Sequence, residues 1–285
     1  MEVSIQEIFC CPLCKGRLER NKQTYICNAC GQAFSHKENI YDFRINRSSG
    51  LRDFWKKEAR KWVATREHEK WVSVLGKYLS EEEFWQILFD GHLKEIEEHA
   101  RSLVCKGGMG ERYDNEFLHR GSISDLHELQ IALRYIPLRE KPGYVLDLGC
   151  GTLRGATELC KMEFEKIFAV DILSDMMSYG YDKLNDRDKK KVILVQADVR
   201  FLPFTNSIFD LVFSVELFEH IDAPLLFLLD IRRVLARNGF AVINTWNGSG
   251  IGYRGKIREK GRAYYKNGFF INSISVKKYK SFCVK

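Results

Sequence analysis

Long apolar runs are absent from this chain of 285 residues, because polar residues interrupt each hydrophobic stretch. The longest tight apolar cluster, residues 224–229, is far shorter than the roughly 20 residues that are needed to span a bilayer. The start of the chain, MEVSIQEIFCC, lacks the basic and apolar segments of a signal peptide. We therefore expect no membrane span and a cytoplasmic protein.

Proline is scarce as well, with five residues, and no internal repeat or low-complexity tract occurs. Hydrophobic residues make up 45% of the chain and charged residues 29%, as in ordinary globular proteins. A chain of this length can bury one large core and carry a small accessory unit.

Cysteine is sparse beyond the first thirty residues, which hold five of the nine cysteines. The other four lie in apolar segments, where cysteine usually acts as a small buried hydrophobe. This distribution argues against a disulfide scaffold and predicts a metal site, with free thiols elsewhere.

Two CxxC pairs stand in the N-terminal segment, Cys11 with Cys14 and Cys27 with Cys30. Four thiolates at this spacing, each pair on a tight turn, can close a tetrahedron around Zn²⁺. Such a site leaves no open coordination position, so the metal is predicted to stabilise the fold and not to catalyse. Redox cysteines or a different metal are the alternatives, and Cys10 duplicates the first ligand.

The runs CPLCKGRL, YICNACGQAF and ENIYDF surround these cysteines. They resemble the zinc-ribbon domain that activates RNA and protein methyltransferases in trans. They are also similar to N-terminal ribbons fused to bacterial methyltransferases, including ribosomal RNA guanine methyltransferases. The resemblance implies a zinc ribbon over residues 1–46.

Residues 51–140 form a second stretch, which follows a linker of polar and small residues. Over its first half, apolar residues recur at steps of three and four between charges, which predicts helices. We interpret the stretch as a helical insert that acts as a lid or substrate cap. Its aromatic stripe could line a substrate, although such stripes more often belong to a core.

The third stretch, residues 141–285, alternates short β-branched runs with helical segments, at intervals that match the crossovers of parallel strands. The predicted fold is α/β, a Rossmann-like sheet of seven mostly parallel strands with helices on both faces. The expected strands are 144–148, 166–171, 191–197, 208–215 and 239–245, closed by a hairpin of 269–276 and 278–284.

A glycine loop with Gly149 and Gly151 links the first of these strands to its helix, and Asp147 stands two residues before it. Glycines there let a ligand approach the backbone closely, as in dinucleotide enzymes. The carboxylate would repel a pyrophosphate and attract the ammonium group of a methionine moiety. A nicotinamide oxidoreductase is thereby disfavoured, whereas a catalytically inactive binding module stays open.

Acidic and polar residues end the following strands, at the carboxyl edge where open α/β sheets bind ligands. Asp171 is expected to hold ribose hydroxyls, and Asp198 the adenine amino group. Ser214, a candidate cofactor-binding residue, and Glu216 reach the same edge from the fourth strand, and His220 follows. Glu216 and His220 are the candidate catalytic residues, with His220 as the base because its pKa lies near neutrality. The alternative is a histidine that only fixes the loop.

The segments VLDLGCGT, FAVDI, VQADVRFLPF, FDLVFSVELFEHI and RRVLARNGFAVINT resemble, in this order, the motifs of class I S-adenosylmethionine-dependent methyltransferases. The resemblance spans residues 143–246 and implies S-adenosylmethionine as the cofactor. The residues that it assigns to the cofactor are Asp147, Gly149 and Gly151 at the methionine end, Asp171 and Ile172 at the ribose and adenine, and Asp198 and Val199 at the adenine edge.

One position departs from the motifs. Leu153 stands where the family has a third glycine, and Gly155 comes two residues later. We expect the helix packing or the contact with the cofactor carboxylate to differ there. Arg154 could pair with that carboxylate, or it could be a solvated helix residue.

The substrate is predicted to be a small molecule with an O, N or C nucleophile. No Asn/Asp-Pro-Pro-Tyr/Phe motif follows the fourth strand, and LFEHI is similar to methyltransferases that act on small molecules. RNA is the alternative, because residues 248–285 hold ten Lys or Arg and one acid, and such a patch attracts phosphates. Solvated lysines along an edge strand would explain the same charge. The ribbon itself is nearly balanced, with seven basic and five acidic residues up to Gly50.

Overall fold

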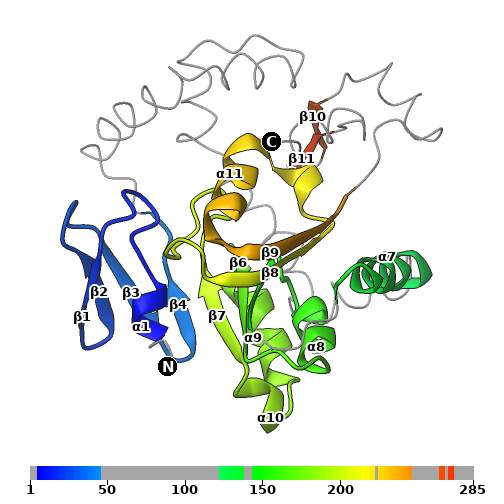
Figure 1. Ribbon diagram of the computed structural model, residues 1–285, viewed down its shortest axis with the longest axis horizontal. Coiled ribbons are helices and arrows are strands. Elements are labelled where there is room, and N and C mark those ends of the chain that lie inside the picture. Colours follow the sequence, from blue (N-terminus) through cyan, green and yellow to red (C-terminus); the bar gives the residue numbers. More distant parts are fainter. Residues whose placement is uncertain are drawn as a thin grey trace. The chain divides into compact units, whose positions relative to one another are not determined.

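A sheet of nine hydrogen-bonded strands organises the larger of two compact units (Figure 1). Its strand order is β1-β2-β3-β4-β7-β6-β5-β8-β9. The structure is a computed structural model, and it describes residues 5–45, 122–137, 143–221, 224–245, 263–266 and 269–272.

Five parallel strands form the catalytic half of the sheet. They are β5 (Tyr144–Leu148), β6 (Lys166–Asp171), β7 (Val192–Gln196), β8 (Phe209–Val215) and β9 (Leu235–Asn244). In β5 to β8 nearly every side chain is buried, as is typical of parallel strands that are covered on both faces. The predicted Rossmann-like arrangement is confirmed.

Helices cover both faces of this half. Helices α7 (Ser122–Arg134), α8 (Arg154–Cys160) and α9 (Ser174–Asp182) pack on one face, followed by the short α10 (Asp186–Lys189). Helix α11 (Pro224–Val234) lies on the opposite side of the sheet from α8 and α9 (Figure 1). Helix α7 belongs to the stretch that was predicted as a lid, yet Leu129 and Ala132 lie in the sheet's own core. The remainder of that stretch is outside the described residues.

The ribbon supplies the other four strands. It consists of the short helix α1 (Ile5–Ile8) and the antiparallel strands β1 (Leu18–Asn21), β2 (Thr24–Cys27), β3 (Ala33–Lys37) and β4 (Ile40–Asp42). Strand β4 pairs in parallel with β7, in the register Ile40 with Leu194 and Asp42 with Gln196. The prediction of seven strands is therefore wrong. The ribbon continues the catalytic sheet because the free edges of β4 and β7 satisfy each other's backbone groups.

The ribbon and the catalytic half also share one aromatic core. The ring of Phe9 lies 4.9 Å from that of Phe43 in the ribbon, 5.6 Å from Phe204 and 6.2 Å from Phe168 in β6, measured between centroids. All four side chains are buried. Burial of this kind is the dominant stabilising contribution to folding, so residues 5–45 fold onto the catalytic sheet as part of one unit.

A second compact unit contains the 3₁₀ helix η1 (Phe218–His220) and the hairpin of β10 (Ala263–Lys266) and β11 (Phe269–Asn272). Strand β11 pairs with β10, which precedes it in the chain, whereas the predicted partner strand 278–284 lies outside the described residues, so the predicted closing hairpin stays a prediction. The hairpin of β10 and β11 forms a sheet of its own. Residues 273–285, including the predicted strand 278–284 and much of the basic tail, lie outside the described residues. Among the described helices, none has the length and apolar character needed to cross a membrane.

Candidate active site and zinc site

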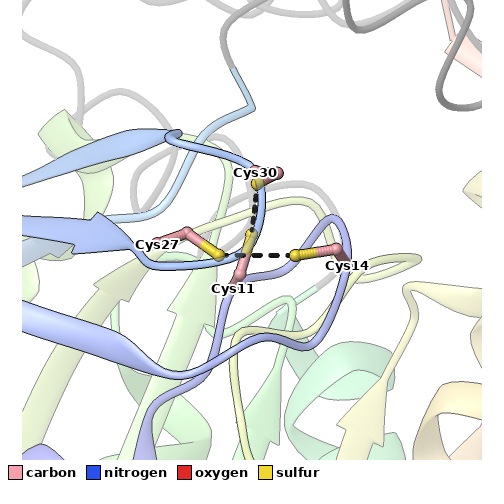
Figure 2. A group of neighbouring side chains, drawn as sticks. All are labelled: Cys11, Cys14, Cys27 and Cys30. Atoms are coloured by element: carbon pink, nitrogen blue, oxygen red, sulfur yellow. Dashed lines mark hydrogen bonds between the residues drawn. The ribbon is translucent and has the colours of Figure 1, made fainter.

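Four cysteine sulfurs converge from two turns of the ribbon (Figure 2). The Sγ atoms of Cys11 and Cys30 are 3.6 Å apart, those of Cys14 and Cys27 are 3.4 Å apart, and all four lie within 4.8 Å of one another. A tetrahedron with Zn–S bonds of about 2.3 Å has S–S edges of about 3.8 Å. The donor set and its size therefore fit a closed structural Zn²⁺ site.

Cys10, which duplicates the first ligand in the sequence, is turned away from this cluster. Its buried thiol donates to the carbonyl of Phe204 at 2.9 Å. The structure thus assigns Cys11 to the metal site and Cys10 to the contact with the catalytic half.

The glycine loop between β5 and α8, residues 149–153, is called the cofactor loop below. Gly149 and Gly151 have φ values of 69° and 50°, in the left-handed region that glycine adopts without steric strain. A side chain at Gly149 would meet Leu217 at 3.0 Å. The loop is held to the sheet because the backbone N–H groups of Gly149 and Cys150 donate to Val170.

Asp147 lies under this loop, 3% exposed. The backbone N–H of Ala156 donates to its carboxylate, while its Oδ2 has no hydrogen-bond partner among the described residues. Burial, with a smaller contribution from the charge of Asp171, raises the pKa of Asp147 to about 7. A buried carboxylate oxygen without a donor is suited to a cationic ligand.

Leu153 keeps the conformation of the glycine that it replaces. Its φ is 64°, which is costly for a side chain of this size, and its side chain is fully buried in the core under α8. The glycine that matters has moved to position 155, where a Cβ would lie 3.0 Å from Oδ2 and 3.2 Å from Oδ1 of Asp147. Gly155 therefore gives the first turn of α8 room beside the carboxylate.

Asp171 ends β6 beside the cofactor loop. Its Oδ2 accepts from the backbone N–H of Gly151 and its Oδ1 from that of Leu173, both at 2.9 Å. Burial raises the pKa of Asp171, although these backbone donors oppose the rise. The next residue, Ile172, is fixed by its carbonyl, which accepts from Nε2 of the buried Gln196 at 2.8 Å.

Asp198, predicted to face adenine, forms a buried ion pair with Arg200. Nε of Arg200 donates to Oδ1 at 2.9 Å and Nη2 donates to Oδ2 at 2.7 Å. The guanidinium thus occupies both oxygens, an arrangement that the sequence analysis did not foresee. Opposite charges two residues apart after a strand were the available signal. Val199 beside this pair is buried.

The candidates from β8 reach the same carboxyl edge. Ser214 is fully buried, and its Oγ has no partner within the described part of the chain. Glu216 has φ 54° and its N–H donates to the carbonyl of Asn244, so a strained residue joins the ends of β8 and β9. His220 lies on η1 in the second unit, and its side chain is outside the described residues.

The chain matches two family models. One, described as Methyltransferase domain, matches residues 146–243, and the other, Trm112p-like protein, matches residues 5–35. The chain carries an S-adenosylmethionine-dependent methyltransferase domain and a Trm112p-like domain.

The likeness to one solved structure agrees with this fold. This chain is similar to a chain in the complex between the Trm112 methyltransferase activator of Haloferax volcanii and the protein assigned as its methyltransferase. The identity is 19%, the match covers 67% of this chain and 74% of that chain, and the TM-score is 0.51. This chain is also similar to an S-adenosylmethionine-dependent methyltransferase of Thermotoga maritima, at 22% identity, with 60% and 74% of the two chains covered and a TM-score of 0.46.

The cofactor loop fits S-adenosylmethionine on the structure's own evidence. The two left-handed glycines leave the backbone open to close approach by a ligand, and the Asp147 oxygen without a partner among the described residues could accept a hydrogen bond from an ammonium group. The methyltransferase therefore binds this cofactor, and the Trm112p-like domain holds the zinc site.

Proposed function

We propose that this methyltransferase transfers the methyl group of S-adenosylmethionine to an O, N or C nucleophile of a small molecule. The bound cofactor supplies an activated methyl group on a sulfonium, which is displaced in line by the nucleophile. The protein has to hold both partners in position, exclude water and, where required, accept a proton.

Asp147 is proposed to bind the amino-acid head of the cofactor, with Gly149 and Gly151 allowing the close approach. Asp171 is proposed to hold the ribose. Each of its oxygens accepts one backbone N–H, and a carboxylate oxygen has a second lone pair for a ribose hydroxyl. Ile172 is proposed to contact the adenine from the same strand end.

The adenine edge is proposed to rest on Val199 and on the loop that Asp198 orders. Because Arg200 binds both oxygens of Asp198, we expect that carboxylate to act mainly by fixing the backbone at Val199. An adenine amino group could donate to the carboxylate of Asp198 only while the guanidinium of Arg200 also stays bound to it.

Glu216 and His220 are proposed as the catalytic residues, with His220 as the group that takes up a proton. The strained backbone at Glu216 supports this role, because strain of this kind clusters at functional sites. Replacement of His220 by alanine tests it. Turnover that stays within about twofold of the parent across pH would remove His220 from the mechanism, since general bases typically contribute at least about a hundredfold.

The observation that favours a small molecule over RNA is the use of the ribbon inside the fold. Strand β4 is paired with β7, and the first zinc turn contacts the loop after β7 through Cys10 and Lys15. Part of the ribbon therefore supports the methyltransferase domain in cis, which gives it a role in the fold that does not require a nucleic acid. The Haloferax volcanii complex joins an activator and its partner as separate proteins, and we propose that this chain carries both functions in one polypeptide.

RNA is the second candidate, and the ten basic residues in 248–285 favour it. Incubation of the enzyme with S-adenosylmethionine carrying a labelled methyl group, a metabolite extract and total RNA separates the two. We expect the label in dialysable, nuclease-resistant products. Label that is retained by dialysis and released by ribonuclease would overturn the small-molecule proposal, and RNA binding that weakens steeply with salt would agree with that outcome.

A further inference from the structure

The first zinc turn ends in a lysine that reaches into the catalytic half. Lys15 follows Cys14 with φ 59°, and its N–H donates to the carbonyl of the zinc ligand Cys11. Its Nζ donates to the carbonyl of Leu202 at 3.1 Å and to Oδ2 of Asp230 at 3.2 Å. The conformation of the zinc turn therefore sets where this ammonium group lies.

The segment that receives Lys15, residues 202–205, is bound to the ribbon along its length. The N–H of Cys10 donates to Pro203 at 2.9 Å, the thiol of Cys10 donates to Phe204, and the N–H of Thr205 donates to Ile8 at 2.8 Å. Few of these polar groups are exposed, so a broken hydrogen bond would leave buried backbone atoms without a partner.

Helix α11 holds the same segment from its other side. Asp230 accepts from the N–H of Leu202 as well as from Lys15, and Nη2 of Arg233 donates to the carbonyl of Leu202 at 3.0 Å. Lys15 and Arg233 thus both bind the carboxylate of Asp230 and the carbonyl of Leu202. Removal of Lys15 leaves Asp230 paired with Arg233 but removes the side-chain link from the zinc turn to Leu202 and Asp230.

The segment continues directly from Asp198 and Val199, which are proposed to form the adenine edge. A second connection reaches the other proposed adenine contact, because the N–H of Phe43 donates to the carbonyl of Gln196 at 2.8 Å and the amide of Gln196 donates to Ile172. The ribbon is therefore connected, through Gln196 and through residues 202–205, to both backbone segments that are proposed to hold the adenosine.

We infer that Lys15 is a positioning residue for cofactor binding, which transmits the zinc-held shape of the ribbon to residues 198–204. This inference rests on the proposed adenosine contacts. It predicts that the affinity for the cofactor depends on Lys15 and on zinc occupancy, although neither touches the cofactor.

The test is calorimetric binding of S-adenosylhomocysteine to the full chain with the substitutions Lys15→Met and Lys15→Arg. Lys22→Met is the matched control, because Lys22 is an exposed lysine of the same ribbon, also with positive φ. We expect binding to Lys15→Met to be roughly three- to thirtyfold weaker, with Lys22→Met unchanged and Lys15→Arg partly restored. Zinc content should be unchanged, and amide hydrogen exchange should rise at residues 199–205.

Affinity within about twofold of the parent, with unaltered exchange at 199–205, would overturn the inference. If Lys15→Met does not fold, graded removal of zinc from the parent chain replaces it. Affinity that is unchanged until the whole unit unfolds would then be the contrary result. Failure of the parent itself to bind S-adenosylhomocysteine would instead count against the proposed function, so the two failures are distinguishable.

Discussion

The carboxylate of Asp147 lies against the α-carbon of Gly155, where an added methyl group would come within 3.0 Å of Oδ2. The contact joins the end of β5 to the first turn of α8, whose N–H at Ala156 donates to the same carboxylate. Both elements are packed into the core, so neither can move away cheaply. The glycine at position 155 thus leaves room for the carboxylate of Asp147 beside the first turn of α8.

Substitution of Gly155 by alanine should therefore disturb the cofactor site and the fold together. We expect a loss of about 1–3 kcal/mol in the free energy of unfolding, which is typical of overpacking, and weaker binding of S-adenosylhomocysteine. Chemical denaturation and calorimetry measure the two effects. Glu163→Ala, at an exposed position just after α8, is the control. A Gly155→Ala variant that binds and unfolds like the parent would contradict the steric argument.

The raised pKa of Asp147 predicts cofactor binding that depends on pH. The carboxyl has a pKa of about 7 instead of 3.8, so below pH 7 the free enzyme holds a proton there that an ammonium group must displace. Affinity for S-adenosylhomocysteine should rise by up to about tenfold per pH unit below 7 and level off above it. Calorimetry in buffers of different ionisation enthalpy should detect the released proton.

The raised pKa of Asp147 also predicts how the stability of the protein depends on pH. Since the folded chain keeps the proton to higher pH than the unfolded chain, Asp147 lowers the stability of the free protein increasingly as pH rises from about 4 to about 7. Asp147→Asn should remove this dependence. The melting temperature of the variant minus that of the parent should therefore increase as pH rises over that interval. The variant should also bind the cofactor product weakly at every pH. Unchanged affinity in Asp147→Asn would remove the basis for the proposed role of this carboxylate.

The parallel strands could be predicted because their side chains form a recognisable apolar pattern in the sequence. β5 and β6 have the predicted bounds residue for residue, since buried parallel strands are continuous apolar runs. The pairing of β4 with β7 could not be predicted, because backbone groups make it and no side-chain pattern marks a sheet edge. The helical insert over most of 51–140, the bounds of the domains and the roles of the site residues stay predictions.

The candidate site, like the fold, could be predicted from the sequence only in part. The cysteine spacing predicted the zinc site, whereas the place of the cofactor at the glycine loop stays a prediction. The pairing of Lys15 with Asp230, 215 residues later in the chain, was beyond sequence reasoning. The only indication of this pair in the sequence is one acidic residue, Asp230, within the apolar run of α11. Similarly, the absent glycine at Leu153 was visible, but burial of the leucine, which offsets its left-handed strain, could be seen only in the fold.

Loss of zinc should destabilise the methyltransferase domain as well as the ribbon. The ribbon continues the catalytic sheet through β4 and covers part of its core, so its unfolding would expose the β7 edge and buried aromatic rings. We expect Cys30→Ser to lose bound zinc and to melt in one transition at lower temperature, with loss of cofactor binding. Metal analysis and scanning calorimetry check this. Two separate transitions, with the catalytic half unaffected, would show that the ribbon is an independent module.

The shared aromatic core can be tested without touching the metal. Phe9 is 3% exposed and contacts rings of both halves, whereas Tyr135 is 73% exposed and serves as a control. Phe9→Ala should lower the free energy of unfolding by about 3–5 kcal/mol, since it removes a buried ring and leaves a cavity. Tyr135→Ala should change it by less than about 0.5 kcal/mol. Because the cavity lies between ribbon and sheet, Phe9→Ala should shift a single unfolding transition that is followed equally by ribbon and sheet probes. Destabilisation confined to the ribbon would mean that the two halves do not depend on a common core.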